Sequence, residues 1–376
     1  MAKKYAIIIG TRPEAIKMIP IYLEMCVRGL EVDIVSTGQH ASMLEQIYVF
    51  FGILPSQKLD VMQPGQNLSG LTARLTEALQ NCFSTKKYDL VLVQGDTTTA
   101  FVASLVAFYN LIPVAHIEAG LRTHNKFSPF PEEINRQLIS RIADYHFAPT
   151  QRALEVLINE GVNKCYLVGN TVIDSLHICL NRIKSRADEY ASKFRIVQNY
   201  DKLVLVTGHR RENFGKGFEE ICTAIRLLST RYPGVLFYYP VHLNPNVKDK
   251  VELMLGGVSN VYLDEPLPYD ELIYLMNRSY LILTDSGGIQ EEGPSLNVPI
   301  LVMRDTTERP EGIEAGCSLL VGTAPENIIE AFTHLMNESS VYNKMVSSSN
   351  PYGDGRSSGK IVDILEQVLT VSITDI

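Results

Sequence analysis

Short apolar runs alternate with amphipathic segments along the whole chain, and no other feature constrains the fold as strongly. Strands are expected at 5–9, 31–36, 90–93, 113–117, 146–148 and 164–167, and the intervening helices include 13–28, 71–83, 97–109 and 131–143. The pattern then restarts, with strands at 202–207, 235–239 and 280–284 and a helix at 217–231. Such alternation is typical of βαβ units and a parallel sheet. The sequence therefore predicts an α/β protein with two Rossmann-like, doubly wound domains.

The length of the chain fits two domains better than one, because 376 residues exceed one ordinary hydrophobic core. We expect the first domain at residues 1–170 and the second at 171–355. The charged, helical stretch 171–200 is the expected hinge region. The C-terminal segment 356–376, with a helix near 359–370, is a candidate to pack back onto the first domain.

Composition excludes several classes of function. The net charge of −8 gives no basic field for nucleic acid or an anionic membrane. The six cysteines are scattered without a CxxC pair or a zinc-type cluster, which indicates buried free thiols in a reducing compartment and no metal site. No stretch approaches the ~18 apolar residues of a membrane span, and the apolar run near the N-terminus is too short for a signal peptide. We therefore expect a cytoplasmic protein.

Ligands of doubly wound folds bind at the carboxyl ends of the strands, so the residues that follow each strand are the candidates. The first such turn, Gly10 to Lys17, is not the GxGxxG of dinucleotide-binding proteins. Arg12 and Lys17 flank the start of the next helix and can both reach an anion there. The alternative is a solvated helix start.

Carboxylates follow the next two central strands. Asp96 ends one strand before three threonines, where it either serves a ligand or, like Thr97, caps the next helix. Glu118 ends the neighbouring strand, and apolar surroundings would make it a plausible acid or base. Strand alternation places His116 on the same face, although a core histidine is the more common arrangement.

A third carboxylate opens the helix expected at 131–143. Glu132 and Arg136 are four residues apart and share a helix face, so an exposed ion pair is the simpler interpretation. Asp96, Glu118 and Glu132 nevertheless all come from strand-end positions of one domain. Three carboxylates that converge there would form an acid/base set.

The second half repeats this arrangement with different chemistry. His209 follows its first strand and could contact a phosphate, and Arg309 supplies a cation near a later strand end. Ser286, Gly287 and Gly288 form a small-residue turn whose backbone N–H groups can cradle a phosphate, although a tight βα turn also explains them. Glu292, inside the following helix, suits the two hydroxyls of a ribose.

Nine segments taken together resemble a known family. They are GTRPEAIK, GDTTTAF, HIEAGLRT, SPFPEEINR, TGHRREN, YPVHLNP, TDSGGIQEE, RDTTERPEG and NPYGDG, which run in order from residue 10 to residue 355. In this order they resemble the motifs of bacterial non-hydrolysing UDP-N-acetylglucosamine 2-epimerases.

The resemblance implies two domains that face each other across a cleft, as in GT-B glycosyltransferases, with UDP bound by the second domain. It also implies a homodimer and no NAD, metal or other cofactor. The family's active-site positions match Arg12, Lys17, Asp96, Glu118, Glu132, Arg136 and His209. Its UDP-contacting positions match Ser286, Gly287, Gly288, Glu292 and Arg309, with Leu267 and Leu272 at the uracil, where core packing is the simpler explanation of the two leucines.

The implied reaction converts UDP-GlcNAc to UDP-ManNAc by elimination and re-addition of UDP, and feeds surface polysaccharide synthesis. Some family members also bind a second UDP-GlcNAc as an activator. The positions of that second site match Gln39, His40, Gln66, Glu132, Arg210 and His242. Two further positions carry Ser42 and Gly65 where strongly activated members have Gln and Arg, which puts activation in doubt.

Three alternatives stay open on sequence alone. A UDP-sugar glycosyltransferase would share the fold and the diphosphate site, but it does not normally need three acidic strand ends. A hydrolysing epimerase would release free ManNAc. A non-catalytic nucleotide-sugar sensor would have no use for an acid/base set.

Overall fold

The computed structural model describes residues 3–371 except 39–40, 64, 209 and 211–212. The chain forms two compact units. Unit 1 comprises residues 1–175 and 352–376, and unit 2 comprises residues 176–351. Each unit contains one parallel sheet, so the predicted α/β class with two doubly wound domains is confirmed.

Unit 1 is built on a seven-stranded parallel sheet in the order β3-β2-β1-β4-β5-β6-β7. The strands are β1 (Lys4–Ile9), β2 (Glu31–Ser36), β3 (Gln57–Lys58), β4 (Leu90–Gln94), β5 (Val114–Ile117), β6 (Tyr145–Ala148) and β7 (Cys165–Leu167). The central strands β1, β4 and β5 are apolar and almost wholly buried, as expected for a parallel sheet covered on both faces.

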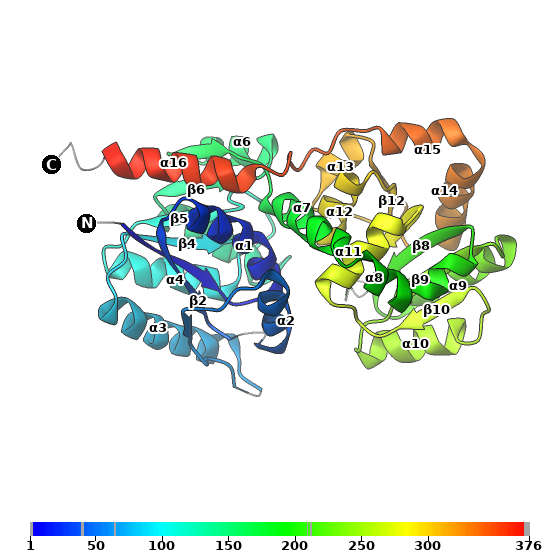
Figure 1. Cartoon of the computed structure of the whole chain (residues 1–376), viewed down its shortest axis with the longest axis horizontal. Coiled ribbons are helices and arrows are strands. Elements are labelled where there is room, and N and C mark those ends of the chain that lie inside the picture. The colour runs from blue at the N-terminus through cyan, green and yellow to red at the C-terminus, as the bar shows by residue number, and fades with distance from the viewer. Residues whose placement is uncertain (1–2, 39–40, 64, 209, 211–212, 372–376) are drawn as a thin grey trace. The chain divides into compact units, whose positions relative to one another are not determined.

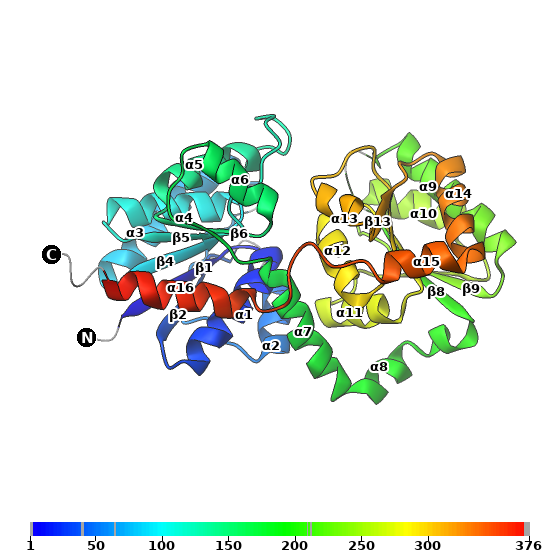
Figure 2. The same cartoon turned by 90° about the horizontal axis from the view of Figure 1, so that it is seen from above.

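The helices of unit 1 cover both faces of its sheet (Figure 2). One group consists of α3 (Leu68–Thr85), α4 (Thr98–Tyr109) and α5 (Glu132–Ile142), which pack against one another. The other face is covered by α1 (Arg12–Val27), with α2 (Ala41–Phe51) beside it. The last helix between strands, α6 (Gln151–Asn159), packs on β6 and β7.

The C-terminal helix α16 (Ser357–Val371) belongs to unit 1 and lies along α1 (Figure 1). Arg28, at the end of α1, donates to Asp363 at 2.6 Å and to Glu366 at 2.8 Å. Asp174 accepts hydrogen bonds from the backbone N–H groups that begin α16, at 3.2 Å from Ser357 and 2.8 Å from Ser358. Acidic side chains are favourable at a helix N-terminus, so both ends of the contact are charge-assisted.

Unit 2 is built on a six-stranded parallel sheet in the order β10-β9-β8-β11-β12-β13. The strands are β8 (Lys202–Thr207), β9 (Val235–Pro240), β10 (Val261–Asp264), β11 (Leu281–Thr284), β12 (Ile300–Val302) and β13 (Ser318–Leu320). Helices α9 (Lys216–Arg231), α10 (Pro245–Leu255) and α14 (Pro325–Asn337) pack together on one face, where their apolar sides form a continuous core with β8, β9 and β11 (Figure 2).

The remaining elements of unit 2 are shorter. They are α11 (Tyr269–Arg278), α12 (Gly287–Glu292), the 3-10 turn η3 (Gly293–Leu296), α13 (Pro310–Glu314) and α15 (Ser339–Val346). The segment predicted as a hinge folds into α7 (Thr171–Lys184), α8 (Ala187–Lys193) and the 3-10 turn η1 (Arg195–Asn199). Within unit 2, Tyr190 and Phe194 stack on Tyr274 of α11 with centroid distances of 5.3 and 5.5 Å.

The cysteine prediction is correct in part. All six cysteines are free thiols, but only Cys82, Cys179, Cys222 and Cys317 are buried. Cys26 is exposed and Cys165 is half-buried, so the expectation of uniformly buried thiols was wrong for these two. Cys26 lies near the C-terminal end of α1, where its side chain is exposed. Within the described residues, no helix is long and apolar enough to cross a membrane.

Candidate active site

Each sheet has one point at which the strand order reverses. In unit 1 the chain moves outward from β1 to β2 and β3, then returns to β4 on the other side of β1. In unit 2 the same reversal falls between β8 and β11. The crevice outside the carboxyl ends of two such strands is the usual ligand site of a doubly wound sheet. The predicted site residues that directly follow strands fall at or beside these two points.

The buried carboxylate of Glu14 holds the switch point of unit 1 together. Its Oε2 accepts the backbone N–H of Gly10 at 3.0 Å and of Thr11 at 2.5 Å, which caps α1. Its Oε1 accepts the hydroxyl of Thr97, from the turn after β4, at 2.6 Å. Gly10 leaves no room for a side chain, because a Cβ there would fall against Thr99. The two turns are therefore locked to each other.

Lys17 and Glu118 form a buried ion pair across unit 1. Lys17 Nζ lies 2.5 Å from Glu118 Oε1, and Gln94 donates to the other carboxylate oxygen. Glu118 has a φ of 62°, a left-handed conformation that is uncommon for a residue other than glycine and that clusters at functional sites. The structure thus brings together two predicted site residues, Lys17 of α1 and Glu118 beyond β5.

Asp96 is paired with Arg136, which is a correction to the simpler interpretation of the α5 sequence. That simpler interpretation pairs Arg136 with Glu132 in an exposed ion pair. Instead its buried guanidinium donates from Nε to Asp96 at 2.9 Å and lies 3.4 Å from Glu133. Thr97, not Asp96, caps α4 by accepting the N–H of Ala100 at 3.0 Å. Because the cap is filled by Thr97, the Asp96 side chain is available to bind Arg136.

Glu132 and Glu133 differ sharply although they are neighbours. Glu132 begins α5 and is half-buried, whereas Glu133 is fully buried. Glu133 accepts the backbone N–H groups of Thr123 at 2.9 Å and His124 at 3.1 Å. Burial alone would raise the pKa of Glu133, but these hydrogen bonds and the nearby Arg136 outweigh it and lower the pKa. Glu133 therefore holds the loop before α5 in place.

His116 lies in the core, as the more common arrangement predicts, and its ring contacts the turn that carries Asp96. It is wholly buried, and its Nε2 lies 2.7 Å from the carbonyl oxygen of Gly95. Burial, followed by the nearby His146, lowers the pKa of His116 to about 3, so its ring is neutral.

Asp285 organises the switch point of unit 2. It is completely buried at the end of β11, where its Oδ2 accepts the backbone N–H of Arg210 at 2.9 Å and the side chain of Asn213 at 3.2 Å. The turns after β8 and β11 are therefore tied together, as in unit 1. The predicted residue His209 lies outside the described residues.

Two arginines flank the glycine turn that begins α12. A Cβ added to Gly287 would lie 3.6 Å from the Arg210 guanidinium and 3.9 Å from that of Arg309. Arg309 is itself oriented by the buried carboxylate of Glu291, to which its Nε donates. Cationic groups beside glycines that carry no side chain suit an anion such as a diphosphate. Ser286 and Gly288 belong to the same turn.

The remaining residues predicted to contact the nucleotide are Glu292, in α12, and the leucines Leu267 and Leu272, at α11. The buried carboxylate of Glu292 accepts the Tyr269 hydroxyl at 2.7 Å. Leu267 and Leu272, before and within α11, are half-buried and absent from the fully buried core. Half-burial leaves both explanations of these two leucines open, packing against the core and contact with a ligand.

The residues matched to a second ligand site are described only in part. Gln39 and His40 lie outside the described residues, as does the side chain of Ser42. Gln66 accepts a hydrogen bond from Arg74 of α3, and Gly65 is exposed. In unit 2, His242 is exposed, and its Nδ1 accepts the N–H of Asn244 at 3.1 Å.

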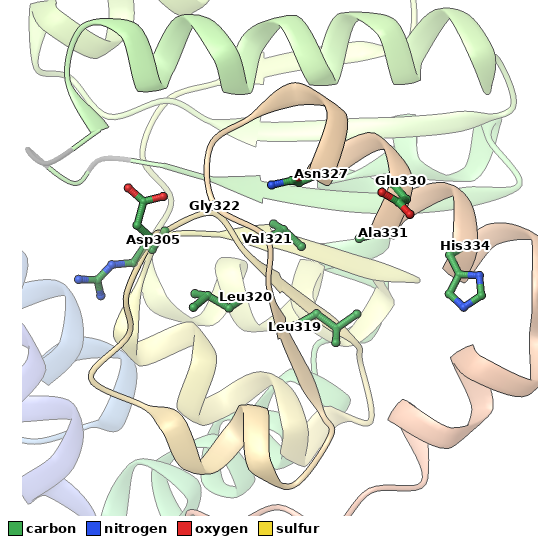
Figure 3. A pocket seen from close by; sticks show the side chains of 10 residues that line it. Asp305, Leu319, Leu320, Val321, Gly322, Asn327, Glu330, Ala331 and His334 are labelled. Atoms are coloured by element: carbon green, nitrogen blue, oxygen red, sulfur yellow. The ribbon is translucent and has the colours of Figure 1, made fainter.

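A cavity of about 660 Å³ opens elsewhere in unit 2, between β13 and α14 (Figure 3). Leu319 and Leu320 line its middle, Asp305 and Gly322 one end, and His334 the other. None of the described residues predicted for the site lines this cavity. Among the described residues, no group of three or more His, Cys, Asp or Glu side chains is arranged to hold a metal ion.

Several residues of these networks were missed by sequence reasoning. Glu14 had a recognisable signal, since Thr11 and Glu14 have the spacing of a capping box. Gln94, Glu291 and Tyr269 had none, because their roles depend on which strand ends and helices meet in the fold.

Two Rossmann-like units, with an acid-rich switch point in one and an arginine-flanked glycine turn in the other, define an enzyme of the GT-B structural class. The model of the UDP-N-acetylglucosamine 2-epimerase family matches residues 26–366, and the chain belongs to this family. The UDP-N-acetylglucosamine 2-epimerase of Campylobacter jejuni is 48% identical over 375 residues, which cover 97% of this chain and 98% of that protein.

Solved structures agree with this assignment. The crystal structure of UDP-GlcNAc 2-epimerase from Neisseria meningitidis bound to UDP-GlcNAc is 46% identical, with a TM-score of 0.92 and coverage of 97% of this chain and 100% of that one. The Methanocaldococcus jannaschii UDP-GlcNAc 2-epimerase, in complex with UDP-GlcNAc and UDP, is 34% identical, with a TM-score of 0.81 and coverage of 97% and 99%.

Proposed function

We propose that this protein interconverts UDP-N-acetylglucosamine and UDP-N-acetylmannosamine by eliminating UDP and adding it back. The proton on C2 of the sugar is not beside a carbonyl, so direct deprotonation is unfavourable. Loss of UDP from C1 while a base removes the C2 proton gives the neutral intermediate 2-acetamidoglucal. UDP then returns to C1 as a proton reaches C2 from the opposite face. In the cytoplasm this product would feed surface polysaccharide synthesis.

Unit 1 supplies the proton-transfer groups in this proposal. Asp96, Glu118 and Glu132 are the candidate acids and bases, and such groups typically contribute 10²–10⁴-fold to a rate. Lys17 and Arg136, which pair with Glu118 and Asp96, hold two of these carboxylates in fixed positions. Arg12 and Lys17, beside the first turn, are also candidates to contact the substrate.

Unit 2 retains the nucleotide in this proposal. Arg309 and the turn Ser286–Gly288 would bind the departing diphosphate, together with His209. Glu292 would accept the ribose hydroxyls, and Leu267 and Leu272 would contact the uracil. Stabilisation of developing negative charge by preorganised donors is commonly the largest catalytic effect. No cofactor or metal is required by this chemistry.

The observation that carries the proposal is the arrangement of carboxylates at the unit 1 switch point. Glu118 adopts an unusual backbone conformation and is held by Lys17, while Asp96, at the neighbouring strand end, is held by Arg136. A glycosyltransferase or a nucleotide-sugar sensor has no evident need for two separately anchored carboxylates here.

Incubation with UDP-GlcNAc alone in D₂O, followed by NMR, tests the proposal. We expect UDP-ManNAc with deuterium at C2, and deuterium at C2 of the remaining UDP-GlcNAc. Unchanged, unlabelled UDP-GlcNAc would contradict the proposal. Release of free ManNAc would instead indicate the hydrolysing reaction.

The second UDP-GlcNAc site is proposed to be weak. Gly65 and Ser42 provide neither the cation nor the amide of strongly activated relatives, while Gln39, His40, Gln66, Arg210 and His242 retain the matching residue types. We expect a near-hyperbolic dependence of rate on UDP-GlcNAc concentration. Marked sigmoidicity would contradict this.

A homodimer is also proposed, and unit 1 offers a face for it. Phe108, Tyr109 and Leu111 expose large apolar surfaces at the end of α4, and Leu138 does so on the adjoining α5. Large apolar side chains exposed on neighbouring elements are consistent with a protein interface. Light scattering should give the mass of a dimer, and Leu111→Asp should shift it towards the monomer.

A further inference from the structure

The ladder of hydrogen bonds between β4 and β5 stops at the strand ends that carry Asp96 and Glu118. The N–H of Gly95 bonds to the Ile117 carbonyl at 3.0 Å. The next donor, the N–H of Ala119, bonds to Phe147 of β6 at 3.0 Å instead. Gly95 and Glu118 both have positive φ, at 68° and 62°, so the segments that follow β4 and β5 diverge here. The Gly95 carbonyl is thereby left without a backbone partner from β5.

The side chain of His116 occupies the position of that missing partner. Its Nε2 lies 2.7 Å from the Gly95 oxygen, and a carbonyl can only accept, so the ring must carry its proton on Nε2. The low pKa of His116, caused by burial and then by His146, keeps the ring neutral at physiological pH. The hydrogen bond therefore has one fixed tautomer.

The carbonyl that His116 binds lies between two anchored parts of the site. Gln94, immediately before Gly95, donates to Glu118, and Asp96, immediately after it, binds Arg136. A Cβ added to Gly95 would lie 3.7 Å from Glu118 Oε2, so this turn passes close to that carboxylate. Any shift of Gly95 would change the separation of the two carboxylates.

We propose that His116 is a positioning residue, which sets the spacing of the Asp96 and Glu118 carboxylates by fixing the turn between β4 and α4. The inference rests on the proposed function, in which both carboxylates act on the sugar. His116 itself does not contact the substrate. Its effect reaches the reaction through Gly95, and a displacement of about 1 Å can cost on the order of 10²-fold in rate.

The variants His116→Leu, His116→Gln and His116→Asn separate positioning from core packing. Leucine removes the donor, whereas the amide nitrogen of glutamine can occupy the place of Nε2. Asparagine is one carbon shorter and cannot reach Gly95. His146 provides a matched control, because it is buried in the next strand beside His116, but its Nε2 lies 3.0 Å from the Ala143 carbonyl and not from that of Gly95.

The full chain is assayed with UDP-GlcNAc in D₂O for kcat, KM and deuterium incorporation, and by calorimetry for UDP affinity. We expect kcat to fall on the order of 10²-fold in His116→Leu and His116→Asn, with KM and UDP affinity within about threefold of wild type. His116→Gln should recover most of the lost kcat. His146→Leu should lower the melting temperature with kcat within about threefold.

Two results would overturn the positioning role. One is a kcat in His116→Leu no lower than in His146→Leu, and the other is an equal loss in His116→Gln and His116→Asn. If His116→Leu does not fold, the comparison of Gln with Asn decides. Failure of wild type to incorporate deuterium would instead overturn the proposed function, so the two failures are distinguishable.

Discussion

The two switch points have the same topology but opposite chemistry. In unit 1, the described carboxylates Glu118 and Asp96 each have a cation of the same unit within ion-pair distance. In unit 2, Arg210 and Arg309 lie beside glycines that offer no side chain, and buried acids behind them hold the turn. The unit 1 point presents carboxylates fixed by cations, and the unit 2 point presents cations, of which Arg309 is fixed by a carboxylate.

The difference follows from what each group would have to do. An acid or base must stay within reach of one proton, so its carboxylate benefits from a fixed position. A departing diphosphate carries charge over several oxygens, so it is better matched by guanidinium groups and open backbone. The comparison predicts that changes in unit 1 affect kcat and changes in unit 2 affect UDP affinity.

The largest expected effect comes from Glu118→Gln, which removes the carboxylate with little change in shape. We expect kcat to fall on the order of 10³-fold, equivalent to about 4 kcal/mol, because general acid/base groups contribute 10²–10⁴-fold. UDP affinity measured by calorimetry should stay near that of wild type. A parallel loss of UDP affinity would break the proposed division between the units.

Acid should weaken unit 1 before unit 2. Burial lowers the pKa of His116 to about 3 and that of His146 to about 4, whereas unfolded histidines titrate near 6.5. Below pH 6.5 the unfolded chain therefore binds protons that the folded unit does not bind, and the free energy of unfolding decreases as the pH falls. At pH 5.5 the loss is about 1.4 kcal/mol for each histidine, roughly 3 kcal/mol together.

Hydrogen exchange followed by mass spectrometry at pH 7.5 and 5.5, corrected for intrinsic exchange rates, checks this effect. Opening should increase first in peptides from β5 and β6, which carry the two histidines. The double variant His116→Gln with His146→Gln should lose most of the pH dependence. Equal loosening of β5 and β9 would contradict a cause confined to unit 1.

Arg309 tests the cationic side of the comparison. Arg309→Gln alone removes the cation that binds Glu291, a carboxylate only 1% exposed, so part of its effect would be structural. The double variant Arg309→Gln with Glu291→Gln removes that complication. We expect its UDP affinity to fall roughly 10- to 100-fold, since hydrogen bonds to charged groups contribute about 1.5–3 kcal/mol. Unchanged affinity would remove Arg309 from the nucleotide site.

The strand-end rule placed the important turns correctly because the strand ends are local features of the sequence. The buried runs that became β1, β4, β5, β8 and β11 are strongly apolar, and their ends were predicted within one residue. The strands β3, β10, β12 and β13 were missed, because two to four residues are too few to show a period.

The interaction partners of the site residues were harder to predict than the positions of these residues at the strand ends. Helical spacing paired Arg136 with Glu132, but the order of strands brings Asp96 closer, and a buried guanidinium takes the partner that best compensates its charge. The left-handed conformation of Glu118 also had no local signal, since glutamate does not favour positive φ. Such features depend on tertiary packing.

The smallest expected effect concerns Tyr269, whose hydroxyl donates to Glu292. Burial raises the pKa of Tyr269 well above its ordinary value, so the hydroxyl remains a donor across the working pH range. Tyr269→Phe removes one hydrogen bond that orients Glu292, and we expect UDP affinity to fall roughly fivefold, about 1 kcal/mol.

The matched control is Tyr238→Phe, because Tyr238 is another buried tyrosine of unit 2 whose hydroxyl donates to a carboxylate, that of Asp264. If Glu292 contacts the ribose, only the Tyr269 variant weakens UDP, and its affinity for uracil alone stays unchanged because uracil has no ribose. Equal effects in the two tyrosine variants would mean that the hydrogen bond serves the stability of unit 2, and the contrast between the switch points would then rest on the arginines alone.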